Sequence, residues 1–530
     1  MEFGTQDQLV LLALLVAIAA LLVAAPVMRI PYPILLVLGG LALGFVPGIP
    51  ALELPPDVVL VAILPPLLYA AAFFTSLRDL RANVKPIGIL SIGLVLATMG
   101  AVAVVAHAAI DGMSWSAAFV LGAVVSPTDP IAATAIMRRF GVPRRVVTVV
   151  EGESLVNDGT ALVLYRVAAT AAVSGTFSFW DASWRFLWNV AGGIAIGLVV
   201  GYLVAEVRRR MDNPPVEVTI ALMTGYLAFI PANAAEASGV LAAVTAGIYL
   251  GWHTPELTSV QTRLQGLAVW EILVFVINAL LFALVGLQLS RILDALTGLA
   301  ARELTWYALL VTGTVILTRL LWVPVFTYVP NWIFRRMGER GPAPPIAQSF
   351  LISWTGMRGA VSLAAALAIP LTTDAGTSFP QRDLIVFLTF CVILGTLVVQ
   401  GLSLPAIIRA LRIEPDHLDE KEDTKARIHA AEAALARLEE LMDEDWVRED
   451  TAQRLRGLYN FRRDRFASRF DSESDGAIEE QSLNYQRLRR ELLEAERAAI
   501  VGLRREGVIN DDAMRRLARD LDLEDARLDV

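Results

Sequence analysis

Apolar residues run through the first three quarters of the chain in stretches long enough to cross a lipid bilayer. A transmembrane helix needs about 20 consecutive, mostly apolar residues, and short segments rich in charge, Pro and Gly separate these stretches. The pattern predicts an all-α polytopic membrane protein with about thirteen transmembrane helices. The expected spans are 8–28, 33–47, 57–75, 86–108, 115–137, 146–173, 187–207, 215–231, 235–251, 265–289, 304–329, 346–369 and 383–409.

Composition supports the membrane class and divides the chain into two regions. Hydrophobic residues make up 55% of the chain, and the mean hydropathy is +0.57. Residues from 411 onward carry a formal charge of -9, whereas the residues before them carry +1. We therefore expect a transmembrane domain at 1–410 and a cytosolic helical tail at 411–530. The tail either has a role in regulation or dimer support, or is simply a solvated helical bundle. The tail holds no Gly-rich phosphate loop, and the sequence predicts no cofactor and no nucleic-acid partner.

The distribution of Lys and Arg between the expected loops predicts the orientation. With the N-terminus outside, the inner loops hold seventeen of these residues and the outer loops hold four. Cytoplasmic loops are enriched in Lys and Arg, so the count favours an outer N-terminus and a cytoplasmic tail, in a bacterial-type plasma membrane. The same asymmetry favours an odd number of spans.

Two prolines break the fifth expected span at Thr128 and Asp129. Pro127 and Pro130 each remove an amide donor and push the preceding residue away from helical geometry. Irregular backbone at membrane depth is tolerated only where protein buries it or where it lines a cavity, and it exposes carbonyl groups that can bind an ion. The break therefore indicates an ion site.

The sixth span places several polar residues at the same depth. Helical spacing puts Ser154 and Asp158 on one face, with Glu153 and Asn157 on the neighbouring face. With a carbonyl of Thr128, Asp158 and Ser154 would form an all-oxygen site suited to a monovalent cation such as Na⁺ or Li⁺. Because burial favours the neutral form of a carboxyl group, a proton and a cation can compete for it.

The twelfth span contains Arg358 between two glycines, and the eleventh contains Arg319. A buried arginine needs an acid, and we expect Glu153 to pair with Arg358. Arg319 has Asp129 or Glu153 as possible partners, or it extends to the membrane interface. Two interrupted helices, one in each half of the chain, indicate an inverted-repeat transporter, with spans 4–6 and 11–13 as the matching core bundle.

The stretches 126–130, 151–158 and 356–359 together resemble the monovalent cation:proton antiporter family, which includes bacterial Na⁺/H⁺ antiporters and eukaryotic sodium/proton exchangers. The resemblance covers residues 10–410 and implies a homodimer, with a dimerisation domain and a core that moves elevator-fashion. It implies that Asp158 takes up the cation or the proton, and that Ser154, Asp129 and Thr128 coordinate the cation. It also implies that Asn157 marks an electroneutral exchanger, and that Glu153 and Arg358 form a structural ion pair.

The chain departs from that family's pattern in the third span. Many relatives carry an acid after a Leu-Pro-Pro-Leu-Leu run, but here the run at 64–68 is followed by Tyr69 and Ala70. The missing carboxylate makes K⁺/H⁺ exchange an alternative to Na⁺/H⁺ exchange. A different class, a cation channel or an ion or pH sensor signalling through the tail, is a further alternative, although no filter-like sequence is present. An enzyme is not expected, because the chain lacks a nucleophile and base constellation.

Overall fold

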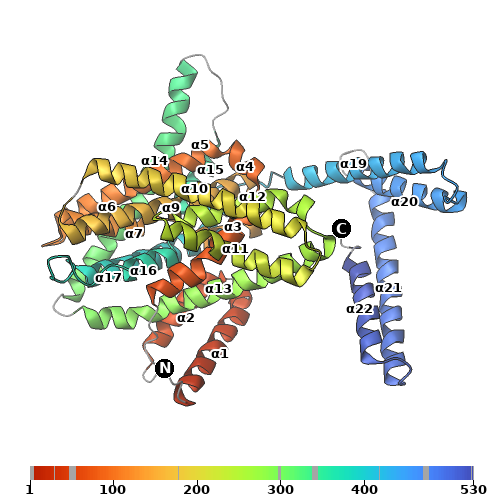
Figure 1. Cartoon of the computed structure of the whole chain (residues 1–530), viewed down its shortest axis with the longest axis horizontal. Helices are drawn as coiled ribbons and strands as arrows, with labels where there is room; N and C mark the ends of the chain where they lie inside the picture. Colours follow the sequence, from red (N-terminus) through yellow and green to blue (C-terminus); the bar gives the residue numbers. More distant parts are fainter. Residues whose placement is uncertain are drawn as a thin grey trace. The chain divides into compact units, whose positions relative to one another are not determined.

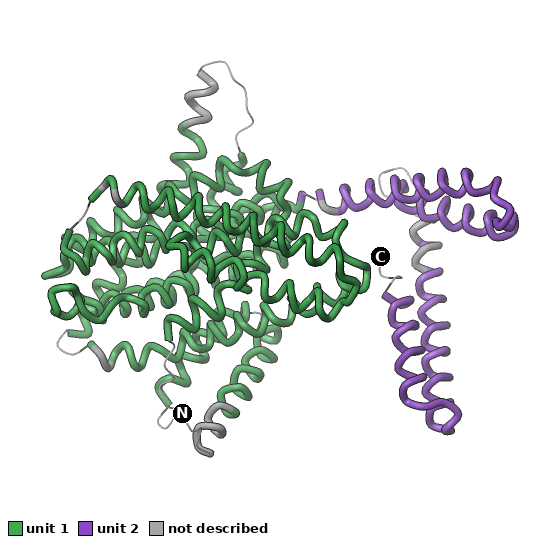
Figure 2. Tube along the Cα trace, in the orientation of Figure 1, with its two compact units in different colours: residues 1–415 green, residues 416–530 purple. Residues whose placement is uncertain are grey.

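The computed structural model describes the chain except for residues 1–4, 29, 47–54, 177, 297–299, 337–343, 417, 469–476, 527 and 529–530. It separates into two compact units, residues 1–415 and 416–530 (Figure 2). Every named element is a helix (Figure 1). The helices of the first unit are α1 (Thr5–Met28), α2 (Tyr32–Gly44), the π-helical η1 (Val58–Ile63), α3 (Leu64–Phe73), α4 (Leu77–Ala82), α5 (Val84–Gly88), the π-helical η2 (Ile89–Leu94), α6 (Val95–Ala109), α7 (Trp115–Val125), α8 (Ile131–Arg139), α9 (Arg144–Ser174), α10 (Phe179–Arg209), α11 (Pro214–Ala234), α12 (Gly239–Leu257), α13 (Val260–Ala295), α14 (Ala301–Arg336), α15 (Ile346–Trp354), α16 (Ala360–Leu367), α17 (Arg382–Gly395), the π-helical η3 (Thr396–Gln400) and α18 (Gly401–Ala410).

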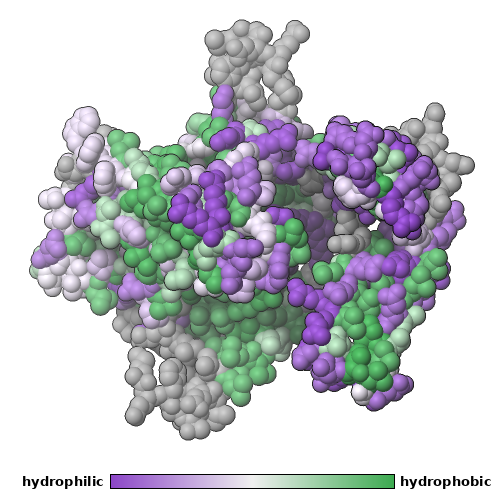
Figure 3. All heavy atoms as spheres, turned by 45° about the vertical axis from the view of Figure 1, so that its right-hand side comes forward, coloured by the Kyte–Doolittle hydropathy of each residue, from purple (hydrophilic) through white to green (hydrophobic). Residues whose placement is uncertain are grey.

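Each of the thirteen expected ranges falls on a helix or on consecutive helical segments, which confirms the all-α membrane fold. Within the described residues, six continuous helices are long and apolar enough to span a membrane. The other expected spans are shorter, interrupted or, like the 31-residue α9, less apolar, so the number of membrane crossings stays a prediction. Several helices are longer than the apolar span expected for them, as α13 is, because a helix continues through polar residues until a cap ends it. Apolar side chains are exposed on the face of the unit that Figure 3 shows.

Both predicted helix interruptions are present. The first separates α7 from α8 at residues 126–130, which contain the two prolines. The second separates α15 from α16 at residues 355–359, where glycines lie on both sides of Met357 and Arg358. The two breaks, each in a different half of the chain, therefore give the expected pair of discontinuous helices.

A proline in the third span leaves a backbone carbonyl without its usual helical donor. Pro66 lacks an amide hydrogen, so the carbonyl of Ala62, four residues earlier, has no helical donor. The Tyr226 hydroxyl of α11 donates to that carbonyl at 2.5 Å. A side chain from another helix thus satisfies the freed backbone group and attaches α11 to the third span.

Helix α13 lies close along α2 because glycines let the two backbones approach each other. A Cβ atom added at Gly40 would lie 2.2 Å from the carbonyl oxygen of Ala283, and one added at Gly286 would lie 2.2 Å from that of Val37. Neither contact tolerates a side chain. This packing fixes the position of α13, which forms one wall of the cavity described below.

The second unit consists of four helices: α19 (Leu418–Leu441), α20 (Glu449–Ser468), α21 (Ala477–Arg505) and α22 (Asp511–Ala526). Helices α19 and α20 pack on each other, as do α21 and α22. Between α21 and α22, Leu493 and Leu521 are buried, and Arg497 pairs with Asp522 and Asp525 at 2.9 and 3.0 Å. The tail is therefore helical, as its pattern predicts.

Candidate functional site

A backbone hydrogen bond joins the two helix breaks. The amide of Asp129, in the first break, donates to the carbonyl of Met357, in the second, at 2.8 Å. The Asp129 carboxylate accepts a hydrogen bond from the amide of Ile131 at 2.9 Å, at the start of α8. A negative side chain at a helix N-terminus is favoured by the helix dipole and by the free amide groups there. Asp129 therefore stabilises the beginning of α8.

Arg358 lies at a helix C-terminus, the end of α7. Its side chain donates to the carbonyls of Val125 at 3.0 Å and Ser126 at 3.4 Å, where α7 ends, and also to that of Gly356. Its amide donates to the hydroxyl of Thr396 at 3.1 Å. A positive charge at a helix C-terminus complements the partial negative charge of the last carbonyls. Arg358 and Asp129 thus complement the two helix ends that meet at the first break, the end of α7 and the start of α8.

Gly359 is required for the close approach of the breaks. A Cβ atom at this position would lie 1.9 Å from the Asp129 carboxylate, a distance that real contacts do not reach. The second glycine of the predicted motif therefore makes room for the acid of the first motif. The sequence contains both residues but gives no direct sign that they meet.

Helix α9 presents its polar residues to the first break. The hydroxyl of Ser154 donates to the carbonyl of Thr128 at 2.9 Å, and the amide of Asn157 donates to the Thr128 hydroxyl at 2.8 Å. The Thr128 hydroxyl donates in turn to the Glu153 carboxylate at 3.0 Å. Three α9 residues thus hold the irregular backbone at Thr128 in place. The structure brings together the residues that the spacing predicted to be neighbours.

The expected ion pair between Glu153 and Arg358 is replaced by another pair. Glu153 forms a two-point interaction with Arg319 of α14, in which Nη2 donates at 2.7 Å and Nη1 donates to the other carboxylate oxygen. Both side chains are about 1% exposed. The Nε of Arg319 donates to the carbonyl of Ile352 at 3.1 Å. The prediction for Arg358 was wrong because the carbonyls at the end of α7 provide its acceptors.

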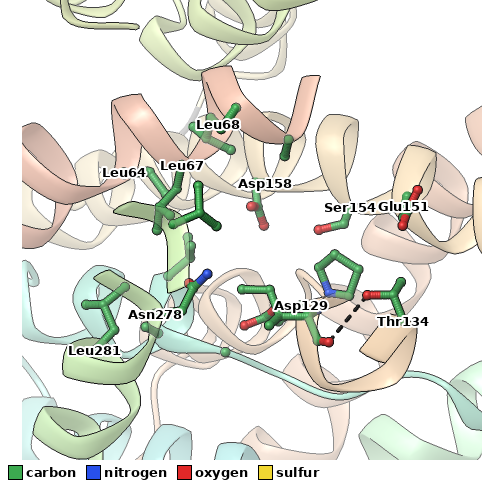
Figure 4. A pocket seen from close by; sticks show the side chains of 18 of the residues that line it. Leu64, Leu67, Leu68, Asp129, Thr134, Glu151, Ser154, Asp158, Asn278 and Leu281 are labelled. Carbon is green, nitrogen blue, oxygen red and sulfur yellow. Dashed lines mark hydrogen bonds between the residues drawn. The ribbon is translucent and has the colours of Figure 1, made fainter. Parts of the chain in front are cut away.

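A cavity of about 590 Å³ lies beside these breaks. Asp158, Ser154 and Asp129 border it, and Figure 4 shows the side chains of Asp158 and Asp129 projecting toward it from opposite sides. Thr128 also lines the cavity. The Asp158 side chain is buried, with the residue 8% exposed, and makes no hydrogen bond within the described part of the chain. A carboxylate facing a polar part of a buried cavity can exchange a proton for a cation.

The remaining cavity wall is mostly apolar. The third span contributes Leu64, Leu67 and Ala70, and Ala70 occupies the place where the resemblance leads one to expect an acid. Asn278 of α13 is a polar lining residue on this wall (Figure 4). As a polar residue within an apolar span, Asn278 stands out in the sequence, but its spacing alone does not place it at this cavity.

Glu151 lies farther along the cavity than Asp158. It pairs with Arg138 of α8 at 2.7 Å, and both residues line the cavity. Because the Arg138 side chain is 68% exposed, this pair contacts solvent, unlike the pair at Glu153. The three acids of α9 thus have three different environments.

These features define a class: a polytopic membrane transporter with two interrupted helices and a buried carboxylate between them. The chain belongs to the transmembrane sodium/hydrogen exchanger family, whose family model matches residues 10–410. Members of this family are transporters, not enzymes.

Individual relatives agree with this assignment. The chain is 39% identical over 526 residues to an uncharacterized Na(+)/H(+) exchanger of Mycobacterium tuberculosis, covering 98% of this chain and 96% of that protein. It is 33% identical to a sodium, potassium, lithium and rubidium/H(+) antiporter of Bacillus subtilis, over 71% of this chain and 58% of that protein.

The fold agrees with a solved structure. The sodium proton antiporter MjNhaP1 from Methanocaldococcus jannaschii, determined at pH 8, matches with a TM-score of 0.61 and 18% identity. The match covers 78% of this chain and 100% of that one. At this identity the similarity establishes a shared fold.

Proposed function

We propose that this chain exchanges Na⁺, with Li⁺ as a further substrate, for protons at Asp158. The observation that carries the proposal is the buried Asp158 carboxylate, which faces one cavity together with Ser154, Asp129 and Thr128. Carboxylate, hydroxyl and carbonyl oxygens are ligands suited to a hard monovalent cation. Membership of the exchanger family supports a Na⁺/H⁺ or K⁺/H⁺ antiporter at the coarser level.

Exchange follows from competition at one carboxylate. In the deprotonated state, Asp158 holds the cation, with Ser154 and the carbonyl of Thr128 completing the oxygen shell. Protonation removes the charge that attracts the cation and releases it. Since either ligand, but not both, occupies Asp158, the two are moved in opposite directions.

K⁺/H⁺ exchange is the second candidate. Ala70 leaves the third-span wall of the cavity without a carboxylate, which lowers the negative charge around the cation. The Bacillus subtilis relative is named for sodium, potassium, lithium and rubidium, and its name favours broad cation use.

The transport movement and the assembly are also part of the proposal. The cavity is lined by residues of α9 and the two breaks, and also by residues of the third span and α13. We expect the first group to move as an elevator-type core against the second, in a homodimer of the plasma membrane with an outer N-terminus and a cytoplasmic tail. Mass measurement in detergent and protease access to the tail in oriented vesicles check assembly and orientation.

The expected result in proteoliposomes is saturable proton efflux on addition of Na⁺ or Li⁺. The measurement is a series of Na⁺, Li⁺, K⁺ and Rb⁺ chlorides against pH, with a fluorescent pH indicator inside and choline chloride as the control. Activity should fall at acid pH because protons outcompete the cation at Asp158. Unitary currents in planar bilayers without counter-flow would instead establish a channel.

Exchange should be electroneutral, because Asn157 is neutral and holds Thr128, and Asp129 is engaged at the start of α8. One carboxylate then carries either one cation or one proton. Moving a net charge would couple transport to voltage by about 2.3 kcal/mol per 100 mV, or about 50-fold in the equilibrium. Imposing a valinomycin-set potential should therefore leave the rate and the endpoint of Na⁺/H⁺ exchange unchanged, whereas a voltage-dependent endpoint would contradict the proposal.

A further inference from the structure

The oxygen ligands around Asp158 are unevenly distributed over the cavity. Asp158, Ser154, Thr128 and Asp129 come from α9 and the first break. From the third span, the lining residues between 59 and 71 are all apolar. The third span therefore offers no oxygen ligand to a cation held at Asp158, and a further ligand has to come from another element.

Asn278 is in a position to supply that ligand. The residue is 3% exposed and lines the cavity, and its side chain makes no hydrogen bond within the described part of the chain. Figure 4 shows its amide directed into the space that Asp129 and Asp158 also border. Because the amide faces the cavity and no protein group occupies it, it is available to a ligand inside the cavity.

The neighbours of Asn278 on α13 make it distinctive. Val274, Phe275, Leu281 and Phe282 line the cavity on the adjacent turns, and all are apolar. Glu271, which also lines the cavity, lies about 10 Å farther along the helix axis, at seven residues and 1.5 Å per residue. The close packing of Gly40 and Gly286 fixes this part of α13. Asn278 is thus held rigidly where the third span offers no polar group.

We propose that Asn278 is a cation ligand that sets the selectivity of the antiporter, an inference that rests on the proposed function. Its amide carbonyl contributes an oxygen without adding a negative charge. A neutral ligand attracts the cation less than a carboxylate does, so the dehydration cost of small ions is less fully compensated. The site should then accept K⁺ and Rb⁺ alongside Na⁺ and Li⁺.

Two substitutions separate the contributions of the amide. Asn278→Leu removes the oxygen while nearly keeping the volume, and should raise the KM for every cation about tenfold, as expected for the loss of one polar contact to an ion. Asn278→Asp replaces the amide with a carboxylate of the same shape. It should lower the KM for Na⁺ and Li⁺ relative to that for K⁺ about fivefold or more, and make the apparent affinity more dependent on pH.

The controls distinguish a ligand from a structural residue. Val276→Leu lies on the exposed face of the same helix, outside the cavity lining, and should leave all KM values unchanged. Asn278→Gln keeps the amide and should retain more cation affinity than Asn278→Leu. A purely structural role would change kcat and melting temperature in every salt, without changing the ratio of the KM values.

Cation binding gives a readout that does not require transport. The melting temperature of the purified wild-type protein should rise with NaCl or KCl relative to choline chloride, since a ligand that binds the folded state stabilises it. In Asn278→Leu the rise should need about tenfold more salt. Wild-type binding without exchange would refute the proposed function alone. Unchanged KM ratios and unchanged salt dependence in both Asn278 variants would overturn the role of Asn278.

Discussion

Asp158→Asn is expected to abolish cation-driven proton movement in proteoliposomes, reducing it to the background of empty liposomes. The substitution keeps the shape of the side chain but removes the charge that attracts the cation and the group that takes up the proton. Because Asp158 makes no hydrogen bond within the described residues, its loss breaks no protein contact there. The measurement is Na⁺-driven proton flux across the pH range in which the wild type is active.

The control for this result is Asp111→Asn, which makes the same chemical change in an exposed turn after α6. It should transport as the wild type does. The Asp158→Asn protein should keep the wild-type melting temperature and elute as the same species in detergent. Flux at the wild-type rate in a folded Asp158→Asn protein would exclude Asp158 as the exchange site.

Glu153→Gln should lower the free energy of unfolding by about 3–5 kcal/mol, because it leaves the buried Arg319 without a counter-charge. The melting temperature should fall markedly, and the yield of folded protein should be smaller. Glu153→Leu combined with Arg319→Met removes both charges and should be milder than either single change, since neither charge is then left alone. Thermal unfolding of the wild type, Glu153→Leu, Arg319→Met and the double variant in one detergent gives the coupling energy.

The exposed pair on the same helix provides the comparison. Glu151→Gln breaks the interaction with Arg138, and exposed ion pairs contribute about 1 kcal/mol or less. Its melting temperature should stay close to that of the wild type. Equal losses from Glu151→Gln and Glu153→Gln would contradict the difference in burial between the two pairs.

The sequence predicted those features of the site that depend on local chemistry. Pro127 and Pro130 act on their own backbone, so the break at Thr128 could be located without any tertiary information. The pairing of Ser154 with Asp158 on one helix face likewise follows from 3.6 residues per turn. The helical ranges were predictable for the same reason, whereas their ends were less accurate because polar residues continue several helices beyond the apolar segment.

Features that depend on contacts between distant helices were less predictable. Two buried arginines, Arg319 and Arg358, were available to Glu153, and sequence spacing does not tell which one faces α9. The choice is made by the packing of α14 and by the carbonyls at the end of α7, which accept from Arg358. The place of Asn278 opposite Asp158 has the same origin, because it depends on how closely α13 approaches α2.

The hydrogen bond between the amide of Asp129 and the carbonyl of Met357 uses only backbone atoms. Replacing either side chain leaves the bond in place, so a scan of alanine substitutions would not detect it; among the standard residues only proline at 129 removes the donor. The two halves of the core are thus coupled by a contact that tolerates side-chain change at both positions. Side chains around the ion site can therefore differ between relatives while the backbone link between the two interrupted helices is retained.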